Sequence, residues 1–182
     1  EEDLWKIVWE ETPLQWINKL LKNEENDIPL MNSQINAALK SGDDIELLSL
    51  LKIENNIESR DELGHTLLMK VVKYRNPELL QNLLLLGADP DAVDSQGDTA
   101  LVWAAPQNQT EMVAILLQNG ADPDRGMFNS LMWASFHGNS QMVQLLLRQE
   151  SDPNLRSRDG WTALMWASDR GHEQIIQRLL EG

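Results

Sequence analysis

The chain has 182 residues, 42% of them hydrophobic, which is enough for one domain with an apolar core. It has no cysteine, which excludes disulfides, thiolate metal sites and cysteine nucleophiles, and no run of about 18 apolar residues that would span a membrane. The formal charge is −14, and the sequence has no basic stripe of the kind that binds nucleic acid. The chain starts with acidic residues, Glu1–Glu2–Asp3, whereas a secretory signal starts with basic ones. We therefore expect a cytoplasmic or otherwise intracellular protein whose partner is neither nucleic acid nor membrane.

Residues 1–30 carry two apolar stripes at helical spacing. The first comprises Leu4, Trp5, Val8 and Trp9, and the second, after Thr12–Pro13, comprises Leu14, Ile17, Leu20 and Leu21. We predict a helical hairpin over residues 1–30 that caps the units following it, because a stack of helical units otherwise leaves an apolar end in water. An additional docking element is the alternative.

From residue 31 onward the sequence repeats a two-helix pattern. Each unit has a first apolar segment and then a second one, such as Met112–Leu117, whose apolar residues fall on one helical stripe. The equivalent first-segment positions are Ile35, Leu68, Leu101, Leu131 and Leu164, with spacings of 33, 33, 30 and 33 residues. The approximate units are 31–60, 61–93, 94–126, 127–156 and 157–182, of which the first is degenerate.

Polar residues, glycine and proline delimit the predicted helices. Thr66, Thr99, Asn129 and Thr162 occupy N-cap positions before the first helices. Asn76–Pro77–Glu78 is typical of the start of a second helix. Turns such as Gly87–Pro90 end the second helices, and Pro106 should end its own first helix early.

These residues resemble the ankyrin repeat, whose motif runs roughly Asp-x-x-Gly-x-Thr-Pro-Leu-His-x-Ala-Ala, then a second helix and Leu-Leu-x-x-Gly-Ala-Asp. The resemblance covers about residues 31–182 and is strongest at 94–122 and 160–180. It implies an all-α, helix-turn-helix solenoid with short hairpin fingers.

Two departures from the motif carry predictions. The motif histidine is replaced by Met69, Val102, Met132 and Met165, so we expect apolar packing in place of its hydrogen bond. The 30-residue spacing predicts that the finger at residues 124–128 is shortened by three residues.

Catalytic and metal-binding constellations are missing from the sequence. The three histidines fall in different repeats, and none forms the helical pair of a zinc protease. Asp89, Asp91, Asp122 and Asp124 lack the spacing of a calcium loop, and turn formation explains them better. We predict no enzyme activity, no cofactor and no metal site.

The resemblance also implies that first helices and fingers line a concave face that contacts a protein. One equivalent first-helix position carries Lys70, Trp103, Trp133 and Trp166. Two interpretations stay open: a tryptophan ladder that offers contact area to a partner, or rings that pack against their neighbours and the finger base. Nearby positions add Lys73, Tyr74, Phe136, His137, Trp161 and Arg170 to the predicted partner-binding set.

The sequence therefore predicts a monomeric protein–protein interaction module. Its groove would be aromatic toward the C-terminal repeats and basic toward the middle, at Lys70, Lys73 and Arg75, which would suit a partner with an apolar anchor and an acidic flank. The alternatives are a recognition or regulatory domain of a larger protein whose catalytic part lies elsewhere, and a passive spacer. The absence of a polar capping helix at the C-terminus leads us to expect a piece of a longer protein or an array with a bare end.

Overall fold

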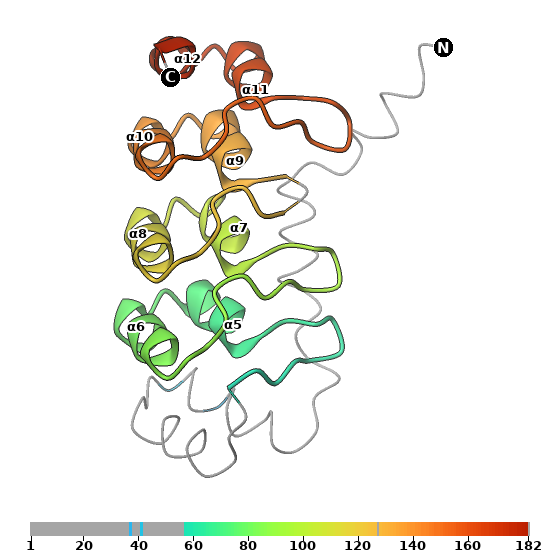
Figure 1. Cartoon of the computed structure of the whole chain (residues 1–182), viewed down its shortest axis with the longest axis vertical. Helices are drawn as coiled ribbons and strands as arrows, with labels where there is room; N and C mark the ends of the chain where they lie inside the picture. The colour runs from blue at the N-terminus through green and yellow to red at the C-terminus, as the bar shows by residue number, and fades with distance from the viewer. Residues whose placement is uncertain (1–36, 38–40, 42–56, 127, 182) are drawn as a thin grey trace.

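The computed structural model describes residues 37, 41, 57–126 and 128–181 (Figure 1). The cap predicted at 1–30 and most of the predicted first repeat, 31–60, lie outside the described residues. The described part contains eight α-helices and no strand, apart from an isolated bridge between Arg60 and Thr66. The helices are α5 (Leu67–Tyr74), α6 (Pro77–Leu85), α7 (Ala100–Ala104), α8 (Thr110–Gln118), α9 (Ser130–Phe136), α10 (Ser140–Arg148), α11 (Ala163–Asp169) and α12 (Glu173–Glu181).

The helices form four stacked pairs, each made of two successive helices (Figure 1). The first helices, α5, α7, α9 and α11, form one row, and the second helices form a parallel row beside it. The connections from each second helix to the next first helix project as fingers on the far side of the first row. The predicted all-α solenoid with fingers is confirmed for these four pairs.

Side-chain caps explain where the first helices begin. Thr66, Thr99, Asn129 and Thr162 are extended, and each side-chain oxygen accepts a hydrogen bond from the backbone N–H three residues later. The predicted N-caps are thus confirmed. Helix α7 has only five residues and ends at Ala104, two residues before Pro106, as its proline predicts.

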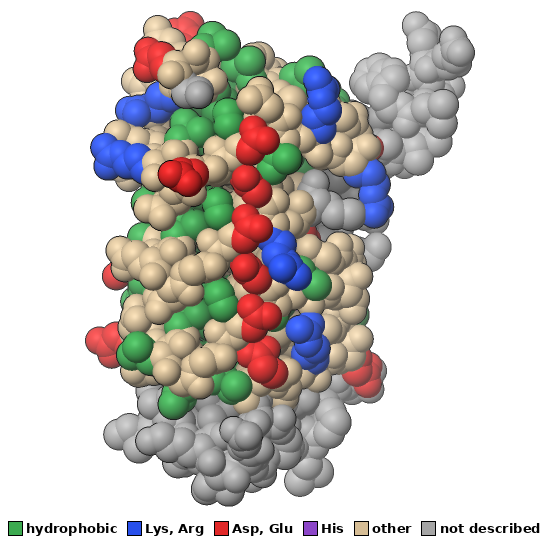
Figure 2. Space-filling view, in the orientation of Figure 1, with side chains coloured by type: hydrophobic (Ala, Val, Ile, Leu, Met, Phe, Trp, Pro, Cys, Tyr) green, Lys and Arg blue, Asp and Glu red, His purple; other side chains and the backbone are tan. Residues whose placement is uncertain are grey.

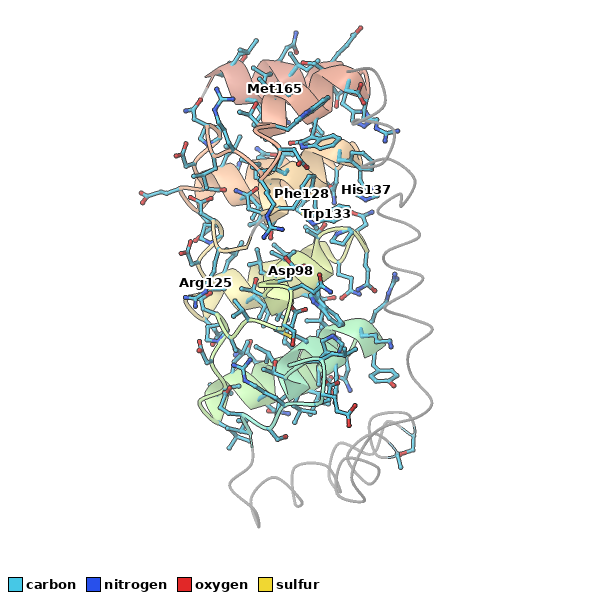
Figure 3. All side chains as sticks on the ribbon, turned by 90° about the vertical axis from the view of Figure 1, so that its right-hand side faces the viewer. Asp98, Arg125, Phe128, Trp133, His137 and Met165 are labelled. Carbon is cyan, nitrogen blue, oxygen red and sulfur yellow. The ribbon has the colours of Figure 1, made fainter. Side chains whose placement is uncertain are left out.

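Apolar packing replaces the missing histidine in three of the four described repeats. Met69, Val102 and Met132 are at most 3% exposed. The prediction is wrong for Met165, which is 43% exposed at the end of the stack (Figure 3). The next finger covers Val102, since a Cβ added to Gly126 would lie 2.8 Å from Val102 Cγ2. The described residues include no finger after α12, so none covers Met165 in the same way.

The turn aspartates link one repeat to the next. Asp91 Oδ1 accepts a hydrogen bond from the Asp122 N–H at 2.8 Å, and Asp124 accepts from the Ser151 hydroxyl at 2.6 Å. Asp89 Oδ1 accepts from the Asp91 N–H within its own turn, which confirms the turn-forming interpretation. Figure 2 shows the acidic side chains as a column along the stack, between the second helices and the fingers.

Candidate functional site

The third described finger is shorter than its neighbours. Eleven residues, 119–129, separate α8 from α9, whereas fourteen, 86–99 and 149–162, form each of the connections on either side. The longer fingers close in a turn, as where the Gly97 N–H donates to the Asp94 carbonyl at 3.0 Å. The predicted loss of three residues is therefore confirmed, and the short finger brings Phe128 directly before the N-cap of α9.

One first-helix position ties each finger to its helix. In the first described repeat, Lys70 Nζ lies 3.2 Å from Asp61 Oδ2. In the next repeat the equivalent Trp103 donates from Nε1 to Asp94 Oδ2 at 3.0 Å, and the His65 ring packs edge-on against it at 4.7 Å. Lys70 and Trp103 thus make equivalent connections, each to the aspartate at the same position of its own finger.

The last two repeats make this connection with aromatic contacts. The Trp133 ring meets Phe128 at 4.6 Å between centroids, and Trp166 meets Trp161 at 4.5 Å. Trp133 is only 6% exposed, so the packing interpretation describes it and it offers almost no surface to a partner. Trp103, Trp161 and Trp166 remain partly exposed, so they can both fasten a finger and contact a partner.

The rings of the last two repeats join into one aromatic cluster, which consists of Phe128, Trp133, Phe136, Trp161 and Trp166. Phe136 meets Trp166 at 5.3 Å, and Phe128 also meets Trp166 at 5.3 Å, so the cluster crosses from α9 to α11. Phe128 was not among the predicted site residues, because the shortened finger breaks the register in which the other fingers align. Figure 3 shows Phe128 and Trp133 on the side where the fingers project.

Three nitrogen-bearing side chains gather at one border of this cluster, and we call them the cationic end: His137, Arg170 and His172. The Arg170 guanidinium lies 4.0 Å above the centre of the Phe136 ring, a cation–π contact. The His137 ring stacks on Trp133 at 5.7 Å and an interplanar angle of 13°.

His172 completes the cationic end from the turn before α12. Its Nε2 lies 3.2 Å from the Phe136 carbonyl, and because a carbonyl only accepts, Nε2 carries a proton. The ring lies directly over Gly138, where an added Cβ would be 2.7 Å from His172 Cε1. Burial lowers the pKa of His137, and the nearby Arg170 and His172 lower it further.

The predicted basic patch is less basic than its sequence indicates. Lys70 is paired with Asp61, whose carboxylate also accepts a hydrogen bond from the His65 backbone N–H. Burial alone would raise the pKa of Asp61, but the hydrogen bonds from His65 and the charge of Lys70 outweigh it and hold that pKa well below its usual range. The Lys70 charge is therefore largely neutralised within its own repeat.

The remaining residues of the predicted basic patch end α5. Burial lowers the pKa of Lys73 and raises the pKa of Tyr74, since both side chains are half-buried. Arg75 caps the helix with φ of 57° and donates from Nη2 to the Gln107 carbonyl at 3.5 Å. These residues lie in the first described repeat, whereas the cationic end lies in the third and fourth, so the ten predicted site residues do not form one patch.

The described residues contain no group of three or more histidine, aspartate or glutamate side chains placed to hold a metal ion. No helix in the described part of the chain is long and apolar enough to cross a membrane.

Comparison with known proteins identifies the family. A comparison with curated proteins finds no match. A family model for ankyrin repeats in three copies matches residues 35–127 and 129–182, which is most of the chain. The count of five repeats stays a prediction, since the structure describes four helix pairs. The chain belongs to the ankyrin repeat family.

Proposed function

We propose that this chain is a binding module that holds a partner protein on the face formed by the aromatic cluster and the cationic end. Ankyrin repeats are generally protein–protein interaction modules. The observation that carries this assignment is a continuous set of rings across two repeats, in which Phe136, Trp161 and Trp166 are still partly exposed. Partly exposed aromatic and arginine side chains are the types that concentrate binding energy at interfaces.

A passive spacer fits these residues less well. A spacer needs only enough packing to hold each finger, and the contact between Trp133 and Phe128 already does this for the shortened one. Phe136 and Arg170 instead stack on each other at a border open to solvent, where packing the core does not require them. This favours binding over spacing. A recognition role within a larger protein uses the same face and makes the same prediction.

The test is a selection of short peptides from a random displayed library on the immobilised full chain. The selected peptides are then measured against Trp161→Ala, with Leu85→Ala as the matched control, because Leu85 is 73% exposed on the second-helix layer. We expect Trp161→Ala to weaken binding about tenfold and Leu85→Ala to leave it within twofold. If no peptide is selected, or if both variants bind like the unaltered chain, the proposed face is wrong.

A further inference from the structure

We infer that the partner segment is acidic: one of its carboxylates sits among His137, Arg170 and His172, and an apolar residue beside it packs on the aromatic cluster. This inference rests on the proposed function and adds the chemistry of the partner.

Charge complementarity is the first argument for an acidic occupant. The chain as a whole carries a formal charge of −14, and its turn aspartates form a column along another face (Figure 2). Against this background the Arg170 guanidinium lies over the Phe136 ring, the His137 ring meets the same ring edge-on, and His172 Nε2 lies 3.2 Å from the Phe136 backbone carbonyl. The positive charge of Arg170 on a protein of net negative charge attracts an acidic segment, which gives orientation as well as affinity.

The geometry of Arg170 is the second argument. Its guanidinium stacks on Phe136, and a stacked guanidinium keeps the in-plane N–H donors that match a carboxylate. Its contact with Asp169 is weak, since Nε lies 3.6 Å from Oδ2, beyond hydrogen-bonding distance, and both side chains are at least 40% exposed. Phe136 therefore positions a donor group that Asp169 does not saturate.

His137 supplies a further property of the site. Burial disfavours the protonation of His137, and so do the groups that face it, Arg170 at the C-cap of α11 and His172 in the turn before α12. A bound carboxylate reverses this balance, because a negative charge within a few ångströms favours the imidazolium form. Binding should therefore take up a proton and tighten as the pH falls, while glutamate, with an ordinary pKa of about 4.3, stays ionised at pH 5.5.

The experiment extends the peptide selection. We expect the selected pool to be enriched in aspartate or glutamate next to an apolar residue. For a synthetic peptide from that pool, Arg170→Glu should lower the affinity at least tenfold. Arg148→Glu, which reverses an exposed charge in the last turn of α10, should change it less than twofold. Arg170→Gln provides a second variant with a smaller expected loss, and circular dichroism checks that each variant is folded.

The pH dependence gives an independent readout. Between pH 7.5 and 5.5 the affinity of the unaltered chain should rise about threefold to tenfold, because the bound carboxylate raises the pKa of His137. The His137→Gln chain should show a shallower profile, because one of the two imidazoles beside the carboxylate is removed. An affinity that stays level or falls on acidification in the unaltered chain would overturn the inference.

The outcomes separate this inference from the proposed function. If binding is lost in Trp161→Ala but the pool is neutral or basic, or Arg170→Glu and Arg148→Glu bind alike, the groove stands and the acidic partner is wrong. If peptides bind all variants equally, both proposals fail. If the chain associates with itself and Arg170→Glu abolishes this, the occupant is the acidic column of a second copy, and the peptide inference is overturned.

Discussion

Truncating Trp133 tests whether the tryptophan position is a structural anchor. Trp133 is 6% exposed and packs against Phe128 at 4.6 Å and His137 at 5.7 Å, so nearly the whole indole is removed from water. An indole buries about 150–250 Å², worth roughly 4–6 kcal/mol at about 25 cal/mol per Å², and residual burial in the unfolded chain lowers this figure. We expect Trp133→Ala to cost about 3–5 kcal/mol, the range typical of large core truncations.

The matched variant is Trp161→Ala, which removes the same side chain from a partly exposed finger position. Its expected cost is about 1–2 kcal/mol, since only part of its area is buried, mainly against Trp166. Urea unfolding followed by far-UV circular dichroism measures both, together with the melting temperature, which should fall by about 6–20 °C for Trp133→Ala. A free energy of unfolding for Trp133→Ala within about 1 kcal/mol of that of the unaltered chain, or above that of Trp161→Ala, would refute the structural role of Trp133.

Four further substitutions test the turns and one buried carboxyl. Burial, reinforced by Asp94, raises the pKa of Asp98 to about 6, above the unfolded value of about 3.9, so stability should decline as the pH rises from 4 through 6. Asp98→Asn should reduce this dependence of the urea midpoint on pH and raise the free energy of unfolding at pH 7 by up to about 3 kcal/mol. Parallel curves of urea midpoint against pH for the variant and the unaltered chain would contradict this. Glu150→Gly should raise the free energy of unfolding by about 0.5–1 kcal/mol, because Glu150 has φ of 61°; a loss of stability would refute this. Gly171→Ala, at φ of 71° with open space around the new Cβ, should lower the free energy of unfolding by about 1 kcal/mol. Gly138→Ala, at φ of 74°, should lower it by about 1–3 kcal/mol more, because its Cβ would lie 2.7 Å from the His172 ring. Equal losses for the two variants in thermal unfolding would count against this packing.

The features predicted correctly from the sequence are local ones. Thr66 and Asn129 cap helices because a short polar side chain reaches an N–H three residues away, which depends on nothing outside the turn. Pro106 shortens α7 for an equally local reason. The family followed from the same local signals recurring at a fixed spacing.

Burial was less predictable because neighbouring repeats decide it. Lys70 and Trp133 share one position of the repeat, yet the first pairs with a turn aspartate and the second is enclosed by Phe128. Met165 has the same sequence context as Met132 but no described finger above it, so the expectation of packing failed there. Phe128 was overlooked because a deletion in its finger removed the alignment that would have shown it.

The sequence by itself determined the repeating helix pairs, their caps and turns, and the chain's negative charge, since each depends on residue type and short spacing. The tertiary structure alone decided that Arg170 and His137 meet at the aromatic cluster. His137 and Arg170 stand one repeat apart in the chain, and only stacking of α9 on α11 brings them onto the same phenylalanine ring. Distance along the chain carries no information about that contact, because the superposition of whole repeats creates it.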